Sequence, residues 1–146
     1  MAASAVASTP VDILNELLRG EVAAVETYRR AVEQVGSSPM RGQLQDCRWS
    51  HAQRIAKLRE QVISLGGEPA RDADAWGAFA RLFEGGTAGE RAAVAALEEG
   101  EEYGLELYRD ALDKLDASSR QLIETDLLPA QERTQRIVSA LEKTLY

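Results

Sequence analysis

GEVAAVETYRRAV, at residues 20–32, returns eighty positions later as GEEYGLELYRDAL at residues 100–112. In each copy a Gly-Glu pair is followed, seven residues after the Glu, by Tyr-Arg-x-Ala. Apolar residues flank both copies in steps of three and four, the spacing that keeps side chains on one face of an α-helix. That face includes the Glu and the Tyr of both motifs, which are Glu21, Tyr28, Glu101 and Tyr108. The sequence therefore predicts two helices that each direct one carboxylate and one tyrosine into a core.

Two further segments with helical patterns complete a duplicated hairpin. Helices are expected over about residues 10–35, 39–65, 88–115 and 118–145. The chain is thereby divided into a tail at residues 1–9, a hairpin at 10–65, a crossover at 66–87 and a second hairpin at 88–146. Short turns within the hairpins and one long connection between them predict an all-α four-helix bundle with one crossover.

A short helix is expected inside the crossover, because DAWGAFARLF at residues 74–83 is too apolar for a free linker. We expect it to lie over the bundle and to cover part of the core. Pro129 falls inside the fourth helix, where it predicts a kink or a break near Asp126.

The composition narrows the range of partners and compartments. A net charge of −7 argues against nucleic acid or an anionic membrane surface as a partner. No apolar run is long enough to span a membrane. The single cysteine, Cys47, excludes an internal disulfide and fits a reducing compartment, so a cytoplasmic protein is expected.

A polar layer is expected within the core. When the second and fourth helices are aligned at an offset of 83, the polar residues at similar depth are Glu21, Arg48, His51, Glu101, Gln131 and Thr134. A buried carboxylate needs a cation, hydrogen-bond donors or a proton. We expect the hydroxyl groups of Tyr28 and Tyr108 to bond nearby carboxylates, with radical or electron transfer as the alternative role.

The Glu-x6-Tyr pattern in the first and third helices of a duplicated bundle resembles the ferritin-like superfamily, which includes rubrerythrins and bacterioferritins. The resemblance covers residues 10–146 and is strongest to a branch of small bacterial ferritin-like domains of unknown function. Shared features are the LGGEP end of the second helix at residues 65–69, a tryptophan in the crossover, and the Gly-Glu-x6-Tyr of the third helix.

Iron-binding members of that superfamily take a Glu from each of two helices and a Glu-x-x-His from each of the other two. Here Glu21 and Glu101 match the two single ligands, and His51 matches one histidine. Arg48 stands at the Glu position three residues before His51, and the second Glu-x-x-His is replaced by Gln131 and Thr134. Three of the six expected ligands therefore remain.

Two functions stay open at this point. In the favoured one the centre is metal-free and non-enzymatic, because Arg48 and a protonated His51 act as counter-charges for Glu21 and Glu101. The protein would then work through self-association, as a homodimer by analogy with the fold, or through a protein partner. The apolar surface expected for that contact comprises Val25, Trp49, Leu107 and the crossover aromatics.

The alternative is a metal site. Glu21, His51 and Glu101 would hold iron, manganese or zinc, for storage, sensing or oxidase activity. In the favoured hypothesis no cofactor is bound.

Overall fold

The computed structural model describes residues 8–73 and 89–145, and all of its regular elements are helices. The long helices are α1 (Pro10–Val32), α2 (Ser38–Ser64) and α4 (Gly89–Ala111), and a short 3-10 turn, η2 (Leu112–Lys114), follows α4. The fourth long helix joins α5 (Ala117–Leu122), η3 (Ile123–Leu127) and α6 (Leu128–Thr144) without interruption. The predicted all-α four-helix bundle is confirmed.

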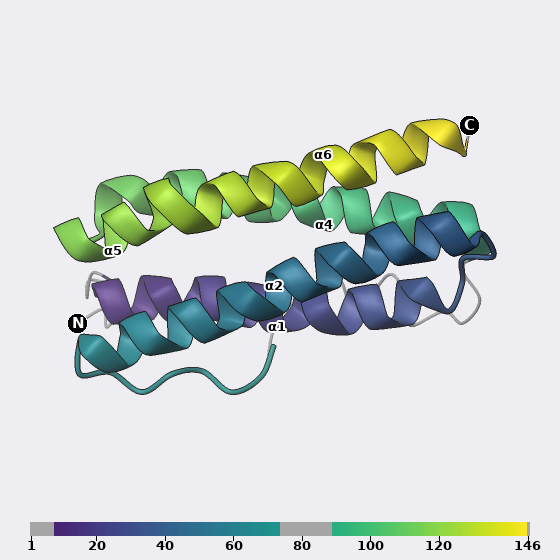
Figure 1. The fold of residues 1–146 in the computed structure, drawn as a ribbon. Helices are drawn as coiled ribbons and strands as arrows, with labels where there is room; N and C mark the ends of the chain where they lie inside the picture. The colour runs from purple at the N-terminus through teal and green to yellow at the C-terminus, as the bar shows by residue number, and fades with distance from the viewer. Residues whose placement is uncertain (1–7, 74–88, 146) are drawn as a thin grey trace, which may run out of the picture.

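The helices pack as two antiparallel hairpins (Figure 1). α1 and α6 run in one direction along the bundle, and α2 and α4 run in the other. α1 packs mainly on α2 and α4 mainly on α6, and the two hairpins meet through α1–α4 and α2–α6 contacts. Because α1 and α4 are antiparallel, the Glu of each repeated motif lies level with the Tyr of the other. None of the helices in the described residues is long and apolar enough to cross a membrane.

The helix ends follow from local side chains. Thr9 and Asp12 form a capping box at the start of α1, and the hydroxyl of Ser37 accepts the Met40 N–H at 3.4 Å at the start of α2. Gly66 ends α2 with a φ of 81°, a left-handed conformation that glycine adopts without strain. The chain beyond is tied to α1, because the amide of Asn15 bonds the carbonyl of Glu68 at 2.9 Å.

Pro129 alters the winding of the fourth helix without breaking it. A proline lacks the N–H that would bond the carbonyl four residues earlier, and its ring clashes with that carbonyl. The chain accommodates it with the π-helical turn η3 immediately before α6, so that Leu128 N–H bonds the carbonyl of Ile123. The break predicted near Asp126 is therefore a single wide turn within a continuous helix.

The core consists of two apolar clusters at opposite ends of a polar layer. One contains Leu44, Leu97 and Val138, and the other contains Leu14 and Leu58. The short helix predicted at residues 74–83 lies outside the described residues, as do residues 1–7 of the tail predicted at residues 1–9.

Candidate functional site

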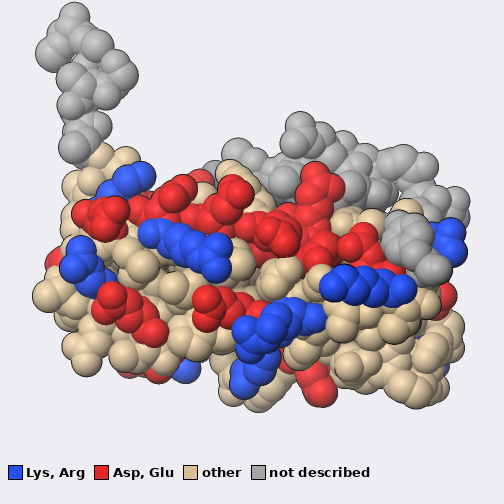
Figure 2. Space-filling model, turned by 90° about the horizontal axis from the view of Figure 1, so that it is seen from above, with Lys and Arg blue, Asp and Glu red and all other residues tan. Residues whose placement is uncertain are grey.

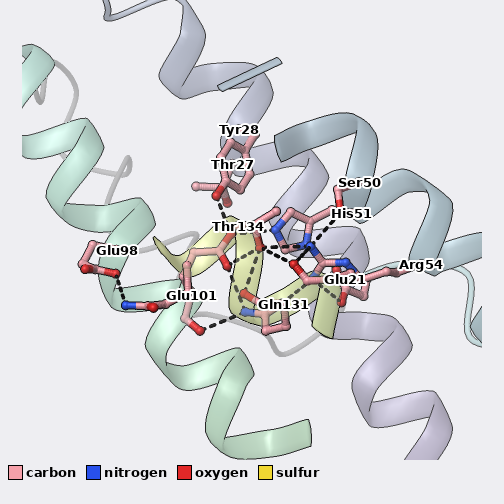
Figure 3. Close-up of polar contacts among 12 residues, drawn as sticks. Glu21, Thr27, Tyr28, Ser50, His51, Arg54, Glu98, Glu101, Gln131 and Thr134 are labelled. Atoms are coloured by element: carbon pink, nitrogen blue, oxygen red, sulfur yellow. Dashed lines mark hydrogen bonds and ion pairs between the residues drawn. The ribbon is translucent and has the colours of Figure 1, made fainter. Parts of the chain in front are cut away.

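The polar layer takes side chains from all four long helices (Figure 3). Its buried polar members are Glu21 on α1, Ser50, His51 and Arg54 on α2, Glu101 on α4, and Gln131 and Thr134 on α6. Each of these side chains belongs to a residue that is at most 8% exposed. At that depth every charge and every polar atom needs a partner within the protein.

The tyrosine of each repeated motif bonds the glutamate of the other motif. The hydroxyl of Tyr28 on α1 donates to Glu101 on α4, and the hydroxyl of Tyr108 on α4 donates to Glu21 on α1. Burial, together with the carboxylate that each hydroxyl faces, raises the pKa of both phenols well above the usual range. Both tyrosines therefore stay protonated and act as hydrogen-bond donors.

His51 lies between the two carboxylates. Its Nδ1 bonds Oε1 of Glu21, and its Nε2 lies 2.7 Å from Oε2 of Glu101. Because an ionised carboxylate only accepts hydrogen bonds, both ring nitrogens must donate, and the ring is an imidazolium. Burial and the guanidinium of Arg54 lower the pKa of His51, but the two carboxylates outweigh them and raise it overall.

Arg54 is the second cation of the layer. Its Nη1 lies 3.3 Å from Oε2 of Glu21 and also bonds Oε1 of Gln131. Its Nη2 lies 3.0 Å from the hydroxyls of both Ser50 and Thr134. Burial alone would raise the pKa of the Glu21 carboxyl, but Arg54, His51 and the hydrogen bonds together lower it to about 2.

Gln131 and Thr134 complete the environment of Glu101. The amide of Gln131 donates to the Glu101 carbonyl at 2.9 Å and to its Oε1 at 3.0 Å, while the Thr134 hydroxyl donates to Oε1 at 2.7 Å. Gly104 makes room for this arrangement, because a Cβ at that position would lie 2.8 Å from Nε2 of Gln131. The second glycine of the later motif thus has a packing role.

The predicted role of Arg48 is wrong. Its side chain is half-buried and bonds Gln45 at 3.1 Å, and the buried guanidinium belongs to Arg54, six residues later. The polar pair on α2 is therefore His51-x-x-Arg54. This pair relates to Gln131-x-x-Thr134 by the same eighty positions that relate the two motifs, so the expected offset of 83 is also wrong.

Both carboxylates of the layer are saturated within the protein, whereas the buried Nε of Arg54 has no hydrogen-bond partner among the described residues. Two carboxylates face one guanidinium and one imidazolium, and all four carboxylate oxygens accept from protein donors. A cavity of about 20 Å³ adjoins the layer beside Glu21, His51 and Tyr108. That volume suits about one water molecule and is far below the size of a typical organic ligand site.

These residues do not fit a di-iron centre. Such a centre needs several anionic oxygen ligands around two cations, whereas here Arg54 adds a positive charge beside Glu21. Glu21, His51 and Glu101 are brought together as predicted, but both nitrogens of the histidine are engaged by the carboxylates. Across the described residues, no group of three or more His, Cys, Asp or Glu side chains is arranged to hold a metal ion.

Most of the chain matches the model of a protein family. Residues 9–114 match the model of a family described as a domain of unknown function, DUF2383. The chain belongs to this family. No curated protein and no solved structure matches it.

The DUF2383 match includes α1, α2 and α4, and therefore Glu21, His51, Arg54 and Glu101. It ends before α6, which supplies Gln131 and Thr134. All four charged members of the polar layer thus lie within the DUF2383 segment.

Proposed function

We propose that the protein is a ferritin-like bundle in which a salt-bridged polar layer takes the place of a di-iron centre. In this proposal the layer holds the bundle together and carries out no chemistry. The work of the protein is done at its surface, through self-association or through binding of a protein partner.

The observation that carries this proposal is the saturation of both carboxylates. Oε1 of Glu21 accepts from His51, and its Oε2 accepts from Arg54 and Tyr108. Both oxygens of Glu101 likewise have protein donors. A metal ion would have to displace these donors and sit beside a guanidinium, which costs Coulomb energy in a buried site.

The nearest competing function is a metal site made by Glu21, His51 and Glu101. The proximity of these three side chains favours it, since His51 contacts both carboxylates. For metal to bind, His51 would have to release a proton and turn one nitrogen from a carboxylate to the ion. The two functions therefore differ in proton release and in metal retention.

Metal content separates the two functions. The protein is incubated without oxygen with ferrous iron, manganese or zinc, desalted, and analysed by mass spectrometry, and its melting temperature is measured with and without each ion. We expect no stoichiometric metal and no metal-dependent change in melting temperature. Retention of one or two ions per chain, lost in Glu21→Ala, would overturn the proposal.

A further inference from the structure

The outward side of α2 carries four exposed apolar or small residues at intervals of seven, with polar residues such as Gln53 and Glu60 between them. Among the large apolar side chains that the structure describes, Trp49 and Ile63 are the most exposed, at 66% and 59%. Gly42 and Ala56, both exposed, lie seven residues before and after Trp49, and Ile63 lies seven residues beyond Ala56. Because a step of seven residues returns to nearly the same face of a helix, these four residues align along one side. We call them the outer stripe, and it extends for about 32 Å.

α2 differs from the other long helices in how its apolar residues are distributed around the helix. The other long helices, α1, α4 and α6, concentrate their apolar residues toward the core, whereas α2 is the least amphipathic of the four. Of the other residues expected to form an apolar surface, Val25 and Leu107 are half-buried, and the crossover aromatics lie outside the described residues. The face over α6 and α4 carries many acidic and basic side chains (Figure 2).

We propose that a second copy of this chain packs its own outer stripe antiparallel against this one. The inference rests on the proposed function and names its partner. A single exposed apolar residue is ordinary in a soluble protein, so the alignment and the order of sizes carry the argument.

The order of sizes along the stripe is small, large, small, large. In an antiparallel two-fold pair, Trp49 of one copy lies opposite Ala56 of the other, and Ile63 lies opposite Gly42. Every large side chain then meets a small one, which allows the helices to approach closely. In a parallel pair Trp49 would meet Trp49 and Gly42 would meet Gly42, leaving a clash and a gap.

The polar residues beside the stripe agree with the same arrangement. Asp46 and Lys57 lie on one flank of α2, and antiparallel pairing brings the carboxylate of one copy toward the ammonium group of the other, twice by symmetry. Lys57 also lies 3.4 Å from Asp126 of its own chain, but its side chain is 49% exposed and remains accessible. Gln45 lies level with Glu60 of the second copy and can donate its amide to that carboxylate.

A contact along one helix of this length is small for a specific interface. It buries roughly 1,000 Å² in total, which is typical of complexes that dissociate readily. The dimer is therefore expected to form in the micromolar range and to require no metal.

Sedimentation velocity of the full chain over a wide concentration range tests the inference. We expect a monomer–dimer equilibrium whose dissociation constant rises at least tenfold in Trp49→Glu and in Ala56→Glu, with unchanged helical content by circular dichroism. Tyr103→Glu, which adds the same charge at an exposed aromatic on α4, should leave the equilibrium unchanged. A monomer at all concentrations, or a dimer unaffected by both α2 substitutions, would overturn the inference.

Cysteine cross-linking tests the direction of the pair. A mixture of Gly42→Cys and Ile63→Cys proteins should form a disulfide between them, whereas Ile63→Cys alone should not cross-link with itself. The native Cys47 is buried and provides the background control. Preferential Ile63→Cys self-linkage would indicate a parallel pair and refute the antiparallel arrangement. Failure of the proposed function is seen separately, as metal retention, and does not depend on the oligomeric state.

Discussion

Replacement of Arg54 by methionine is the most direct perturbation of the polar layer. The substitution keeps a long side chain but removes the cation that contacts Glu21, and it takes a donor from Ser50, Gln131 and Thr134. Removing one partner of a buried ion pair costs about 3–5 kcal/mol. For a chain of this length that corresponds to a fall in melting temperature of roughly 6–20 °C.

Urea unfolding followed by circular dichroism, at one protein concentration and near neutral pH, measures this cost. Arg48→Met is the matched control, because the half-buried Arg48 bonds the side chain of Gln45 on its own helix, and its loss should change stability by no more than about 0.5 kcal/mol. In a double-mutant cycle, Glu21→Gln should relieve part of the cost of Arg54→Met, since the two groups are in contact. A loss below about 1 kcal/mol in Arg54→Met would refute the view that Arg54 compensates a buried charge.

Three further predictions concern the remaining members of the layer. Tyr108→Phe removes a donor to an ionised carboxylate and should cost about 1.5–3 kcal/mol in urea unfolding. Gly104→Ala should destabilise, although alanine favours helix, because its Cβ would lie 2.8 Å from Nε2 of Gln131 and would displace that amide from its hydrogen bonds to Glu101. Melting temperature should fall on both sides of a plateau between about pH 4.5 and 6.5. Glu21, whose pKa is lowered to about 2, loses its stabilising contribution as pH falls below 4.5. His51, whose pKa is raised above 6.5, loses its contribution as pH rises through that higher value.

Each of these predictions has a control or an opposing result. Gly36→Ala, where a Cβ would meet nothing within 4 Å, should be neutral or slightly stabilising. His51→Gln should flatten the alkaline side of the pH profile, and an unchanged profile in that variant would contradict the imidazolium assignment. A Tyr108→Phe protein as stable as the parent would show that Glu21 does not depend on the phenol.

The repeated motif made the fold predictable from the sequence. When a Glu lies on an otherwise apolar helical face and a Tyr follows seven residues later, the pattern strongly indicates that both side chains point into the core. The structure gives both tyrosines the carboxylate contacts expected of them. The sequence also signals two helix ends, because Thr9 favours a helix N-cap and Gly66 favours the left-handed conformation that ends a helix.

The sequence predicts Arg48 as the buried cation, whereas the structure buries Arg54. Arginine is among the residues least often buried, and the offset of 83 aligns Arg48, not Arg54, with Gln131. The spacing of the buried residues on α2 nevertheless points to Arg54. His51 lies four residues after Cys47, and Leu58 lies seven residues after His51. Arg54 stands three residues after His51 and four before Leu58, so it lies on the same face of the helix. Eighty-residue spacing from Thr134 points to the same position. The π-helical turn before Pro129 was not readable, since a kink, a break and a wide turn all accommodate the same proline.

The reciprocal tyrosine contacts bear on how the two halves of the chain find their alignment. Tyr28 and Glu101 are separated by 73 residues and Tyr108 and Glu21 by 87, so neither contact can form until the hairpins dock. Apolar faces alone would tolerate a slip of one helical turn, about 5.4 Å, with similar burial. Such a slip would separate each carboxylate from its phenol and leave buried ions unpaired, at a cost of several kcal/mol. The polar layer thus selects a single register for the docking of one hairpin on the other.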